Sequence, residues 1–382
     1  MRIDYGDGAH CCGCSACVSA CPVSAIRMTE DANGFISPRI DESRCIDCGK
    51  CSKICDFIKA HPEQSNSEKA FSLIIRDKDV LKKSTSGGAF STFSNYIQNQ
   101  SGYIVGSVFE DDFTLRHVIT RDPDVCEKMR GSKYTQSDTQ GVFEKVKGLL
   151  TAGSLVLFTG TPCQCGALKS FLGKEYDNLY VIDLLCHGVP NNRLFKDHIA
   201  YLETVYKSKI KGYCFRDKKY GWNAYSNSVL LQGGKSISKW INQVYYSFFV
   251  KNVSLRPSCY HCPYRSLYRQ GDVTIADFWG YEKVTGEKQN NTGISLVFAN
   301  NKKGLDMIEQ CGVVASVQEV NLKRVQNSIH LNQVISKIDQ RAFWKTYQDG
   351  GYTALVKSYF DSSLSKRLRY TIRKIGKIIT KG

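Results

Sequence analysis

Apolar and polar positions follow two different periods along residues 71–340. Short apolar runs predict strands at 103–109, 155–159, 179–185, 271–277 and 294–299. Longer segments, with apolar residues three and four positions apart, predict helices at 88–98, 142–150, 194–206 and 303–310. Strands and helices that alternate in this way are typical of an α/β domain with a mixed sheet.

The first 58 residues are organised by cysteines instead. Two runs have the same spacing, C-x2-C-x2-C-x3-C, and every cysteine of the second run follows its counterpart at one constant offset. The first run is Cys11, Cys14, Cys17 and Cys21, and the second is Cys45, Cys48, Cys51 and Cys55. Pro22 follows the first run, whereas Asp56 takes that place in the second. This is the run that binds two four-iron clusters in bacterial-type ferredoxins, so an α+β ferredoxin domain is predicted.

In such a domain three cysteines of a run bind one cluster and the fourth binds the other. One cluster is therefore predicted on Cys11, Cys14, Cys17 and Cys55, and the other on Cys45, Cys48, Cys51 and Cys21. Cys12 is a surplus thiol, because only Cys11 preserves the spacing. The alternatives are disulfides, which need an oxidising compartment, and zinc, which usually takes paired C-x2-C knuckles.

Domain boundaries follow from these patterns. The ferredoxin domain is predicted at 1–58, with a hairpin at Asn33 and Gly34 between its two runs, and a polar linker at 59–70. The α/β domain has a first part at 71–150 and a second part at 151–340, and a carboxyl-terminal region covers 341–382.

The composition indicates the cellular compartment in which the protein is expected. The chain has 382 residues, 17 of them cysteine, and no apolar run of the length that spans a membrane. Its amino-terminal residues do not resemble a signal peptide. Many cysteines without such a signal indicate metal ligation in a reducing compartment, so a cytoplasmic protein is predicted.

Four further cysteines are candidate ligands. Cys163 and Cys186 each follow a predicted strand, and Cys259 and Cys262 form a C-x2-C pair. Strand ends can bring such residues to one point, since sites in α/β folds lie at the ends of strands. From spacing alone, a zinc site and an unrelated C-x2-C pair remain open.

Several motifs together resemble the beta subunits of coenzyme F420 hydrogenases and dehydrogenases. They are Ser84-Thr85-Ser86-Gly87-Gly88, Gly131-Ser132-Lys133-Tyr134, Thr161-Pro162-Cys163-Gln164, Cys186-His187-Gly188, Cys259-Tyr260-His261-Cys262, Gly271-Asp272-Val273 and Asp277-Phe278-Trp279-Gly280. The resemblance covers roughly residues 70–330. It implies FAD and a third four-iron cluster on Cys163, Cys186, Cys259 and Cys262. The remaining cysteines, Cys126, Cys165, Cys214 and Cys311, are predicted to be packed thiols.

A flavin agrees with this set of motifs, because clusters carry single electrons while organic substrates usually exchange two. The turn at Gly87 and Gly88 precedes a predicted helix, whose amides can bind a diphosphate. An ordinary turn is the alternative. The predicted cofactor-binding residues are Ser86, Gly87, Gly88, Lys133, Tyr134, Asp277 and Trp279. Tyr134 and Trp279 would otherwise be core aromatic residues.

No catalytic residue can be assigned from the sequence, although His187 is a candidate. It lies beside Cys186 and could transfer a proton, or tune the cluster by hydrogen bonding. Arg216, Asp217 and Trp222 form a polar, aromatic stretch that could meet a substrate.

The carboxyl terminus is basic and amphipathic. Apolar residues from Leu364 to Ile379 share one helical face, while lysines and arginines mostly occupy the other. Such a helix could bind the anionic inner face of a membrane or an acidic partner, or pack on its own domain. Nucleic acid is not expected, since no binding motif accompanies the charge.

Two functions follow. The first is an iron–sulfur flavoprotein oxidoreductase that moves electrons between clusters and FAD, to or from a two-electron substrate or carrier such as reduced F420 or ferredoxin. The second is a non-catalytic electron-transfer subunit that serves a partner enzyme. Relatives with similar Cys-His-Gly-Val-Pro motifs imply a role in surface-polysaccharide biosynthesis. Substrate, donor, direction of flow and oligomeric state are not determined by the sequence.

Overall fold

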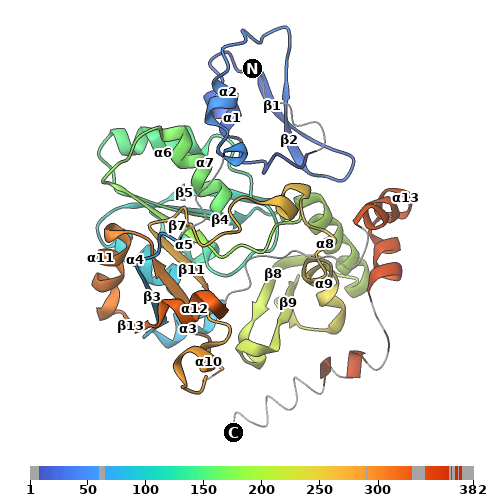
Figure 1. Ribbon diagram of the computed structural model, residues 1–382. Coiled ribbons are helices and arrows are strands. Elements are labelled where there is room, and N and C mark those ends of the chain that lie inside the picture. The colour runs from blue at the N-terminus through green and yellow to red at the C-terminus, as the bar shows by residue number, and fades with distance from the viewer. Residues whose placement is uncertain are drawn as a thin grey trace.

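The protein is described by a computed structural model covering residues 8–59, 65–289, 291–328, 340–360, 363, 366–368 and 370–371. Figure 1 shows a small amino-terminal unit above a large sheet with helices, and a second, smaller sheet to one side. The strands are β1 (Ile26–Glu30), β2 (Ile36–Ile40), β3 (Lys69–Ile75), β4 (Tyr103–Phe109), β5 (Leu115–Thr120), β6 (Val156–Gly160), β7 (Leu179–Leu184), β8 (Ile210–Asp217), β9 (Ser226–Leu231), β10 (Ser236–Ile237), β11 (Val273–Asp277), β12 (Ser295–Ala299) and β13 (Ala315–Val320). The helices are α1 (Ala16–Ala20), α2 (Lys50–Ile54), α3 (Lys78–Lys83), α4 (Ala89–Gln98), α5 (Pro123–Met129), α6 (Val142–Thr151), α7 (Pro162–Leu172), α8 (Asn192–Tyr206), α9 (Val244–Val250), α10 (Tyr281–Thr285), α11 (Lys302–Gln310), α12 (Leu322–Ser328) and α13 (Gln340–Tyr359).

The amino-terminal unit repeats its backbone as it repeats its cysteines. Each run leads into a five-residue helix, α1 or α2, and the residues before these helices, Ser15 and Gly49, both have left-handed backbone conformations. Between the runs, β1 and β2 pair antiparallel, with Ile26 opposite Ile40. Gly34 lies in the connecting turn with a φ of 93° and donates its backbone N–H to Asp31. The predicted hairpin is therefore confirmed.

The large sheet has eight strands in the order β13-β3-β12-β11-β7-β6-β4-β5. The four strands β11, β7, β6 and β4 are parallel to one another, while the pairs on either side of this block are antiparallel. The predicted mixed sheet is thus confirmed. Because the central strands are parallel, their carboxyl ends meet at one edge of the sheet.

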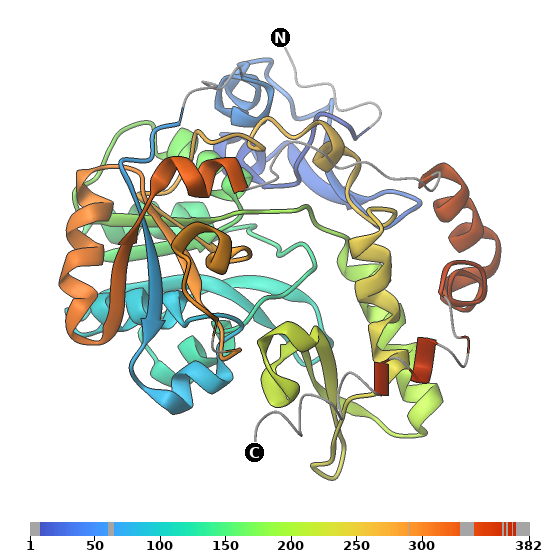
Figure 2. The same ribbon diagram turned by 60° about the horizontal axis from the view of Figure 1, so that its bottom comes forward.

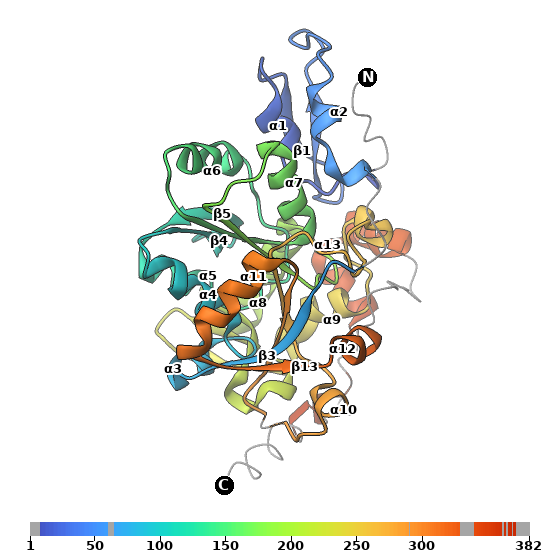
Figure 3. The same cartoon turned by 60° about the vertical axis from the view of Figure 1, so that its left-hand side comes forward.

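Helices cover both faces of this sheet (Figure 3). On one face, apolar residues of α4, α5 and α11 pack in a common core with β4 and β12. On the other face, α6 and α7 pack against β6 and β7. Ala16 of the amino-terminal helix α1 belongs to this second core, so the amino-terminal unit is packed onto the sheet domain.

A third core holds the smaller sheet. Strands β10, β9 and β8 pair antiparallel, and α8, α9 and α13 pack around them (Figure 2). Phe35, at the end of the hairpin in the amino-terminal unit, joins this core and lies edge-on to Trp344, with ring centroids 5.2 Å apart. The small sheet and the amino-terminal unit are therefore both anchored to the rest of the chain by apolar contacts.

The elements predicted from periodicity are present, with ends that differ by one or two residues. The elements that were not predicted in the sheet domain are strands β3, β5, β8, β9, β10 and β13 and helices α3, α5, α7, α9, α10, α12 and α13. Strand β3 starts at Lys69, within the segment that the sequence assigned to a linker, and residues 60–64 of that segment lie outside the described residues. Most of the predicted basic amphipathic helix also lies outside them. In the described part of the chain, no helix is both long and apolar enough to cross a membrane.

One arginine fixes the amino-terminal unit to the sheet domain. Arg256 is only 2% exposed, and its guanidinium donates to the carbonyl oxygens of Cys11 and Ile36, each at 2.6 Å. A third hydrogen bond, of 2.9 Å, joins Arg256 Nη1 to Gln136 Oε1. A charged donor that serves two buried carbonyl groups is costly to remove, because those groups would lose their partners while remaining buried.

Neighbouring polar groups complete this interface. Gln136 Nε2 donates to the carbonyl oxygen of Cys12, at 2.8 Å, and Thr139 Oγ1 donates to that of Cys14, at 2.9 Å. Tyr264 donates its hydroxyl to Asp56 Oδ2, at 2.7 Å. Asp56 is the residue that replaces proline after the second cysteine run, so this departure from the ferredoxin pattern supplies a contact with the sheet domain.

We expect Arg256→Met to lower the free energy of unfolding by about 3 kcal/mol, because it leaves the Cys11 and Ile36 carbonyl groups buried without a charged donor. Anaerobic urea titration measures this loss. Lys345→Met is the control, since the Lys345 side chain is 76% exposed and its ion pair with Asp349 should contribute less than about 0.5 kcal/mol. A loss below about 1 kcal/mol for Arg256→Met would contradict the structural role of the interface.

Candidate functional site

The parallel strands of the large sheet place three of the predicted motifs at one edge. Strand β6 ends at Gly160, β7 at Leu184 and β11 at Asp277. The residues that follow these ends include Cys163, Cys186 and Trp279. The crossover pattern of the sheet therefore brings together residues that are more than 100 positions apart in the chain.

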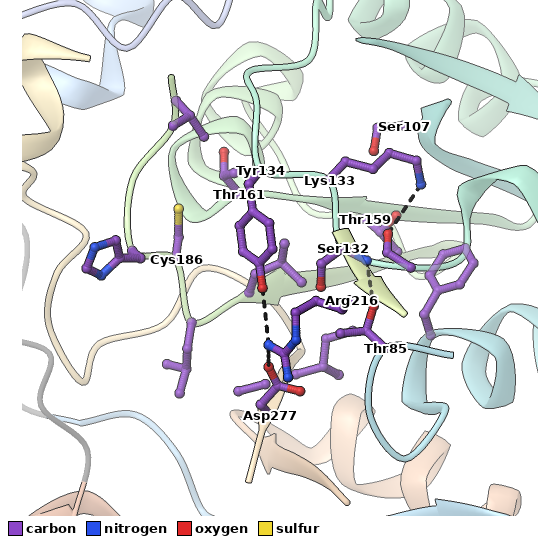
Figure 4. A pocket seen from close by; sticks show the side chains of 18 of the residues that line it. Thr85, Ser107, Ser132, Lys133, Tyr134, Thr159, Thr161, Cys186, Arg216 and Asp277 are labelled. Atoms are coloured by element: carbon purple, nitrogen blue, oxygen red, sulfur yellow. Dashed lines mark hydrogen bonds and ion pairs between the residues drawn. The ribbon is translucent and has the colours of Figure 1, made fainter. Parts of the chain in front are cut away.

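A cavity of about 670 Å³ opens at this edge. All of the predicted cofactor-binding residues except Gly87 line it, together with Cys12, Cys163, Cys186, His187 and Arg216. Figure 4 shows Tyr134, Arg216 and Asp277 facing one another within it, while Cys186 lies at another part of its wall. Its size is within the range of small-molecule and cofactor sites.

The four later cysteines lie within electrostatic reach of one another. Burial and the nearby thiols of Cys259 and Cys163 raise the pKa of Cys186 to about 12. Burial likewise raises the pKa of Cys259 to about 11, with Cys163 acting in the same direction, and raises that of Cys262. The raised pKa values of Cys186, Cys259 and Cys262 favour the protonated thiols, and a bound positive charge, such as that of iron or zinc, would favour their ionisation.

Cys12 lies where the ferredoxin-like unit meets the later cysteines. It is buried with Cys55 and Tyr264, and Cys14, Cys163 and Cys262 pack against the same cluster. A hydrogen bond with Cys12 lowers the pKa of Cys163 to about 7. The surplus thiol of the first run therefore separates two groups of predicted ligands, one on each side of the interface.

Two observations bear on the predicted exchange of fourth cysteines between the runs, which stays a prediction. Cys21 of the first run shares one small cavity with Cys45, Cys48 and Cys51 of the second. Cys55 of the second run acts electrostatically on Cys11, as does Cys14. Across the described ranges, no three side chains of His, Cys, Asp or Glu are placed to hold a single metal ion.

The glycine turn lies at the start of α4, as the sequence predicted. Gly88 has a φ of 91° and precedes the helix; it has no side chain to cap the helix, and Ser295 Oγ accepts a hydrogen bond from the Ala89 backbone N–H at 3.5 Å. Gly88 and Ala89 line the cavity, so the amino-terminal end of the ten-residue helix faces it. Gly87 has another role: an added Cβ would lie 2.0 Å from the carbonyl oxygen of Leu73, so the close backbone approach requires glycine.

Lys133 lines the cavity, but its ammonium group is bound by the chain itself. Nζ donates to the carbonyl oxygen of Met129 at 2.8 Å, and to those of Arg130 and Gly131 at 3.3 Å. Burial lowers its pKa to about 7. Lys133 therefore stabilises the Gly131-Ser132 loop. Because its ammonium group already binds backbone oxygens, less of its positive charge is available to a ligand.

His187 also lines the cavity. Its Nε2 lies 2.5 Å from Asn252 Oδ1, and its ring lies edge-on to Phe249 with centroids 5.0 Å apart. Burial lowers its pKa below the ordinary value, which favours the neutral imidazole. A neutral histidine beside Cys186 is compatible with both predicted roles, proton transfer and hydrogen bonding to the cluster.

Two residues that line the cavity gave no signal in the sequence or only a weak one. His117 is 4% exposed, and burial lowers its pKa to about 4, so the imidazole is neutral. Its Nε2 lies 2.9 Å from the Thr159 carbonyl oxygen. Because a carbonyl oxygen only accepts hydrogen bonds, Nε2 carries the proton and Nδ1 is an acceptor. Arg216 is 6% exposed and pairs with Asp277 at 3.0 Å. No local spacing predicts either placement. His117 comes from β5 of the large sheet and Arg216 from β8 of the small sheet, and only the tertiary fold brings both to the cavity.

The other two residues of the polar, aromatic stretch that could meet a substrate, Trp222 and Asp217, have different roles. Trp222 donates Nε1 to Asp277 Oδ1 at 3.2 Å, so it supports the site. Asp217 accepts from the backbone of Lys219 and caps a short turn, away from the lining residues. Of the cysteines predicted to be packed, Cys126, Cys165 and Cys311 are buried, whereas Cys214 is exposed, so that prediction was wrong for Cys214.

Comparisons with known proteins agree with the two-part organisation. Residues 10–57 match the family model described as 4Fe-4S dicluster domain. Residues 153–324 match the family model for the carboxyl-terminal part of the coenzyme F420 hydrogenase/dehydrogenase beta subunit.

Two individual proteins are similar over most of the chain. An uncharacterized protein of Methanocaldococcus jannaschii is 22% identical over 378 residues, which cover 89% of this chain and 98% of that protein. A chain of the F420-reducing [NiFe] hydrogenase complex from Methanosarcina barkeri, solved as a xenon derivative, is 15% identical. It covers 81% of this chain and 97% of its own length, with a TM-score of 0.46.

The cysteine runs, the mixed sheet and the two family matches agree with one another. Residues 153–324 are similar to the carboxyl-terminal part of the coenzyme F420 hydrogenase/dehydrogenase beta subunit, and residues 10–57 are similar to a 4Fe-4S dicluster domain.

Proposed function

We propose that the protein is an iron–sulfur flavoprotein oxidoreductase, in which electrons pass between [4Fe-4S] clusters and FAD and then to or from a two-electron substrate. One observation carries the proposal: Cys163 and Cys186 line the large cavity, and Cys163 also packs against Cys12 at the edge of the dicluster domain. A continuous series of predicted ligands thus leads from the dicluster domain to the cavity.

A third cluster is proposed on Cys163, Cys186, Cys259 and Cys262. The raised pKa values of Cys186 and Cys259 fit thiol ligands that lose their protons when metal binds. Arg256 lies between this group and Cys11, and its positive charge acts on both Cys163 and Cys11. A buried cation beside thiolates favours added electrons, so Arg256 would raise the potentials of neighbouring clusters.

FAD is proposed in the cavity of about 670 Å³. The residues that would hold it are Ser86, Gly87, Gly88, Lys133, Tyr134, Asp277 and Trp279. The start of α4, where the cap residue Gly88 has no side chain, suits a diphosphate. His117 Nδ1 is a buried acceptor with no partner among the described residues. Iron–sulfur clusters exchange one electron at a time, and a bound flavin converts between one and two.

The carrier or substrate would reach the cavity through its open side, where Trp279 is 40% and Tyr225 is 42% exposed. Reduced F420, ferredoxin and similar carriers are the proposed redox partners, and a place in surface-polysaccharide biosynthesis remains part of the proposal. His187 would hold or transfer a proton at this cavity, because its lowered pKa favours the neutral imidazole and it is next to Cys186.

An electron-transfer subunit that serves a partner enzyme is the second candidate. Cys48 is exposed and Ile46, in the same cysteine run, is 61% exposed. An exposed apolar residue over a predicted cluster is suited to contact with another redox protein. If the chain binds no FAD but keeps its clusters, this second function is favoured.

Anaerobic purification with iron, sulfide, zinc and flavin counted per chain tests the proposal. We expect about twelve irons and one FAD, because each four-cysteine group holds four irons. About eight irons with one zinc would contradict the third cluster. Twelve irons without flavin would contradict the oxidoreductase and leave the electron-transfer subunit.

Cys259→Ser should remove about four irons and leave the remaining eight in place, because it deletes a ligand of the third group alone. Iron analysis and low-temperature electron paramagnetic resonance measure this change. Cys165→Ala is the matched control: Cys165 lies two residues from Cys163 but is fully buried and interacts with the Ile182 carbonyl oxygen at 3.6 Å. An unchanged iron count in Cys259→Ser would refute the ligand assignment.

A further inference from the structure

Five lysines gather at one end of the small sheet. This group, called the lysine end below, consists of Lys207, Lys209, Lys211, Lys235 and Lys239, and each of them is exposed. They come from three places in the chain: the residue after α8, the start of β8, and the segment around β10. The tertiary fold therefore assembles the group, because it brings the turn between β9 and β10 beside the end of α8.

Backbone and ring contacts show this arrangement. The carbonyl oxygen of Lys209 accepts from the backbone N–H of Gln232 at 2.8 Å, which joins the β9–β10 turn to the start of β8. Lys239 Nζ lies 5.6 Å from the ring centroid of Tyr206, the last residue of α8. Among the described residues, no atom lies within 4 Å of the place that a side chain would take at Gly233, so the turn projects into solvent.

Few acidic groups offset the charge of the lysine end. Between residues 203 and 239 the chain has eight Lys or Arg and two acidic residues, Glu203 and Asp217. Glu203 pairs with Lys209 at 2.7 Å, whereas Asp217 lies at the other end of β8 and accepts from the backbone of Lys219. The carboxyl-terminal end of α8 favours a cation only next to its last turn. The lysines therefore repel one another, and an anionic surface would relieve this repulsion.

Exposed aliphatic side chains lie among these lysines. Val205, in the last turn of α8, is 45% exposed, and Leu230 of β9 is 40% exposed. Leu230 pairs with Ser236, the neighbour of Lys235. A mixture of lysines and aliphatic residues suits a layer of anionic head groups over apolar chains. The phosphate backbone of a nucleic acid offers the aliphatic residues no such partner.

The described part of the carboxyl-terminal segment lies against the same end. The ring centroid of Tyr370 is 5.4 Å from that of Trp240, and the Tyr370 hydroxyl lies 3.2 Å from Ser238 Oγ. Trp240 and Ser238 flank Lys239 in the chain. Three exposed residues of this segment continue the mixture of basic and aliphatic side chains: Lys366, Arg367 and Leu368.

The lysine end lies away from the dicluster domain. Figure 1, Figure 2 and Figure 3 all show the amino-terminal unit at the top and the small sheet in the lower half of the molecule. Arg216, which lines the cavity, is at the opposite end of β8 from Lys211. A flat surface that contacts the lysine end would therefore leave the dicluster domain accessible to other redox proteins.

We propose that the lysine end binds the surface of a membrane that contains anionic phospholipids. The ammonium groups would contact the lipid phosphates, while Val205 and Leu230 would enter the head-group layer. This membrane contact goes beyond the oxidoreductase activity and does not depend on it, because it uses no residue assigned to a cluster or to FAD.

Vesicle flotation with the purified full chain tests the proposal. One set of vesicles contains equal parts of phosphatidylglycerol and phosphatidylcholine, and the other contains phosphatidylcholine alone. The chain should float with the first set and not with the second, and added salt should release it, because the attraction is electrostatic. No binding to the anionic vesicles, or equal binding to both sets, would overturn the proposal.

A variant that combines Lys211→Gln, Lys235→Gln and Lys239→Gln locates the binding surface. Each lysine near an anionic surface contributes about five-fold to binding, so this variant should bind the anionic vesicles about 100-fold more weakly. Leu230→Ser should weaken the binding about three-fold, since it removes an apolar contact with the lipid. If Leu230→Ser leaves vesicle binding unchanged, the surface attracts polyanions in general, and the lipid proposal is refuted.

The matched control removes three exposed lysines of the large-sheet domain, in α6 and after α7: Lys145→Gln, Lys147→Gln and Lys174→Gln. It lowers the net charge by the same amount and should bind the anionic vesicles like the unchanged chain. An equal loss in both variants, or a loss in neither, would refute the lysine end as the binding surface. Vesicle binding by a chain without flavin would leave this proposal standing while the oxidoreductase proposal fails.

Discussion

The arrangement of this protein depends on a buried guanidinium at the junction of its two parts. Arg256 donates to carbonyl oxygens of the first cysteine run and of the hairpin, and it also binds Gln136 of the sheet domain. Each of these groups is withdrawn from water, so each would be costly to leave unpaired. The dicluster domain is therefore held in one position, with Cys12 against Cys163.

That position gives the cysteine groups their order. The group with Cys48 lies at the surface, the group with Cys11 and Cys14 lies at the interface, and Cys163 and Cys186 of the later group line the cavity. Such an order is suited to electron transfer in steps, because each group neighbours the next. The same interface explains Asp56, which departs from the ferredoxin pattern and accepts a hydrogen bond from Tyr264.

The cavity combines two kinds of environment. Near α4 it offers backbone amides and a turn of glycines, whereas near β11 it offers an ion pair and stacked aromatic rings. The first is suited to the phosphates of the proposed FAD. Both lie at the edge where the parallel strands end, because β6, β7 and β11 run in the same direction.

The sequence by itself determined the two cysteine runs, the mixed sheet and most of its central strands, since these depend on spacing and local periodicity. The start of helix α7 is visible in the sequence, because Thr161 and Gln164 form a capping box after β6. Strand β3 was obscured by the polar segment before it, and its place between β12 and β13 depends on pairing with residues more than 200 positions away. Only the tertiary structure decided that Cys12 lies between two ligand groups, that Lys133 binds backbone oxygens, and that Arg216 and His117 face the cavity. These are long-range contacts, and no local pattern encodes which distant residue will be the neighbour.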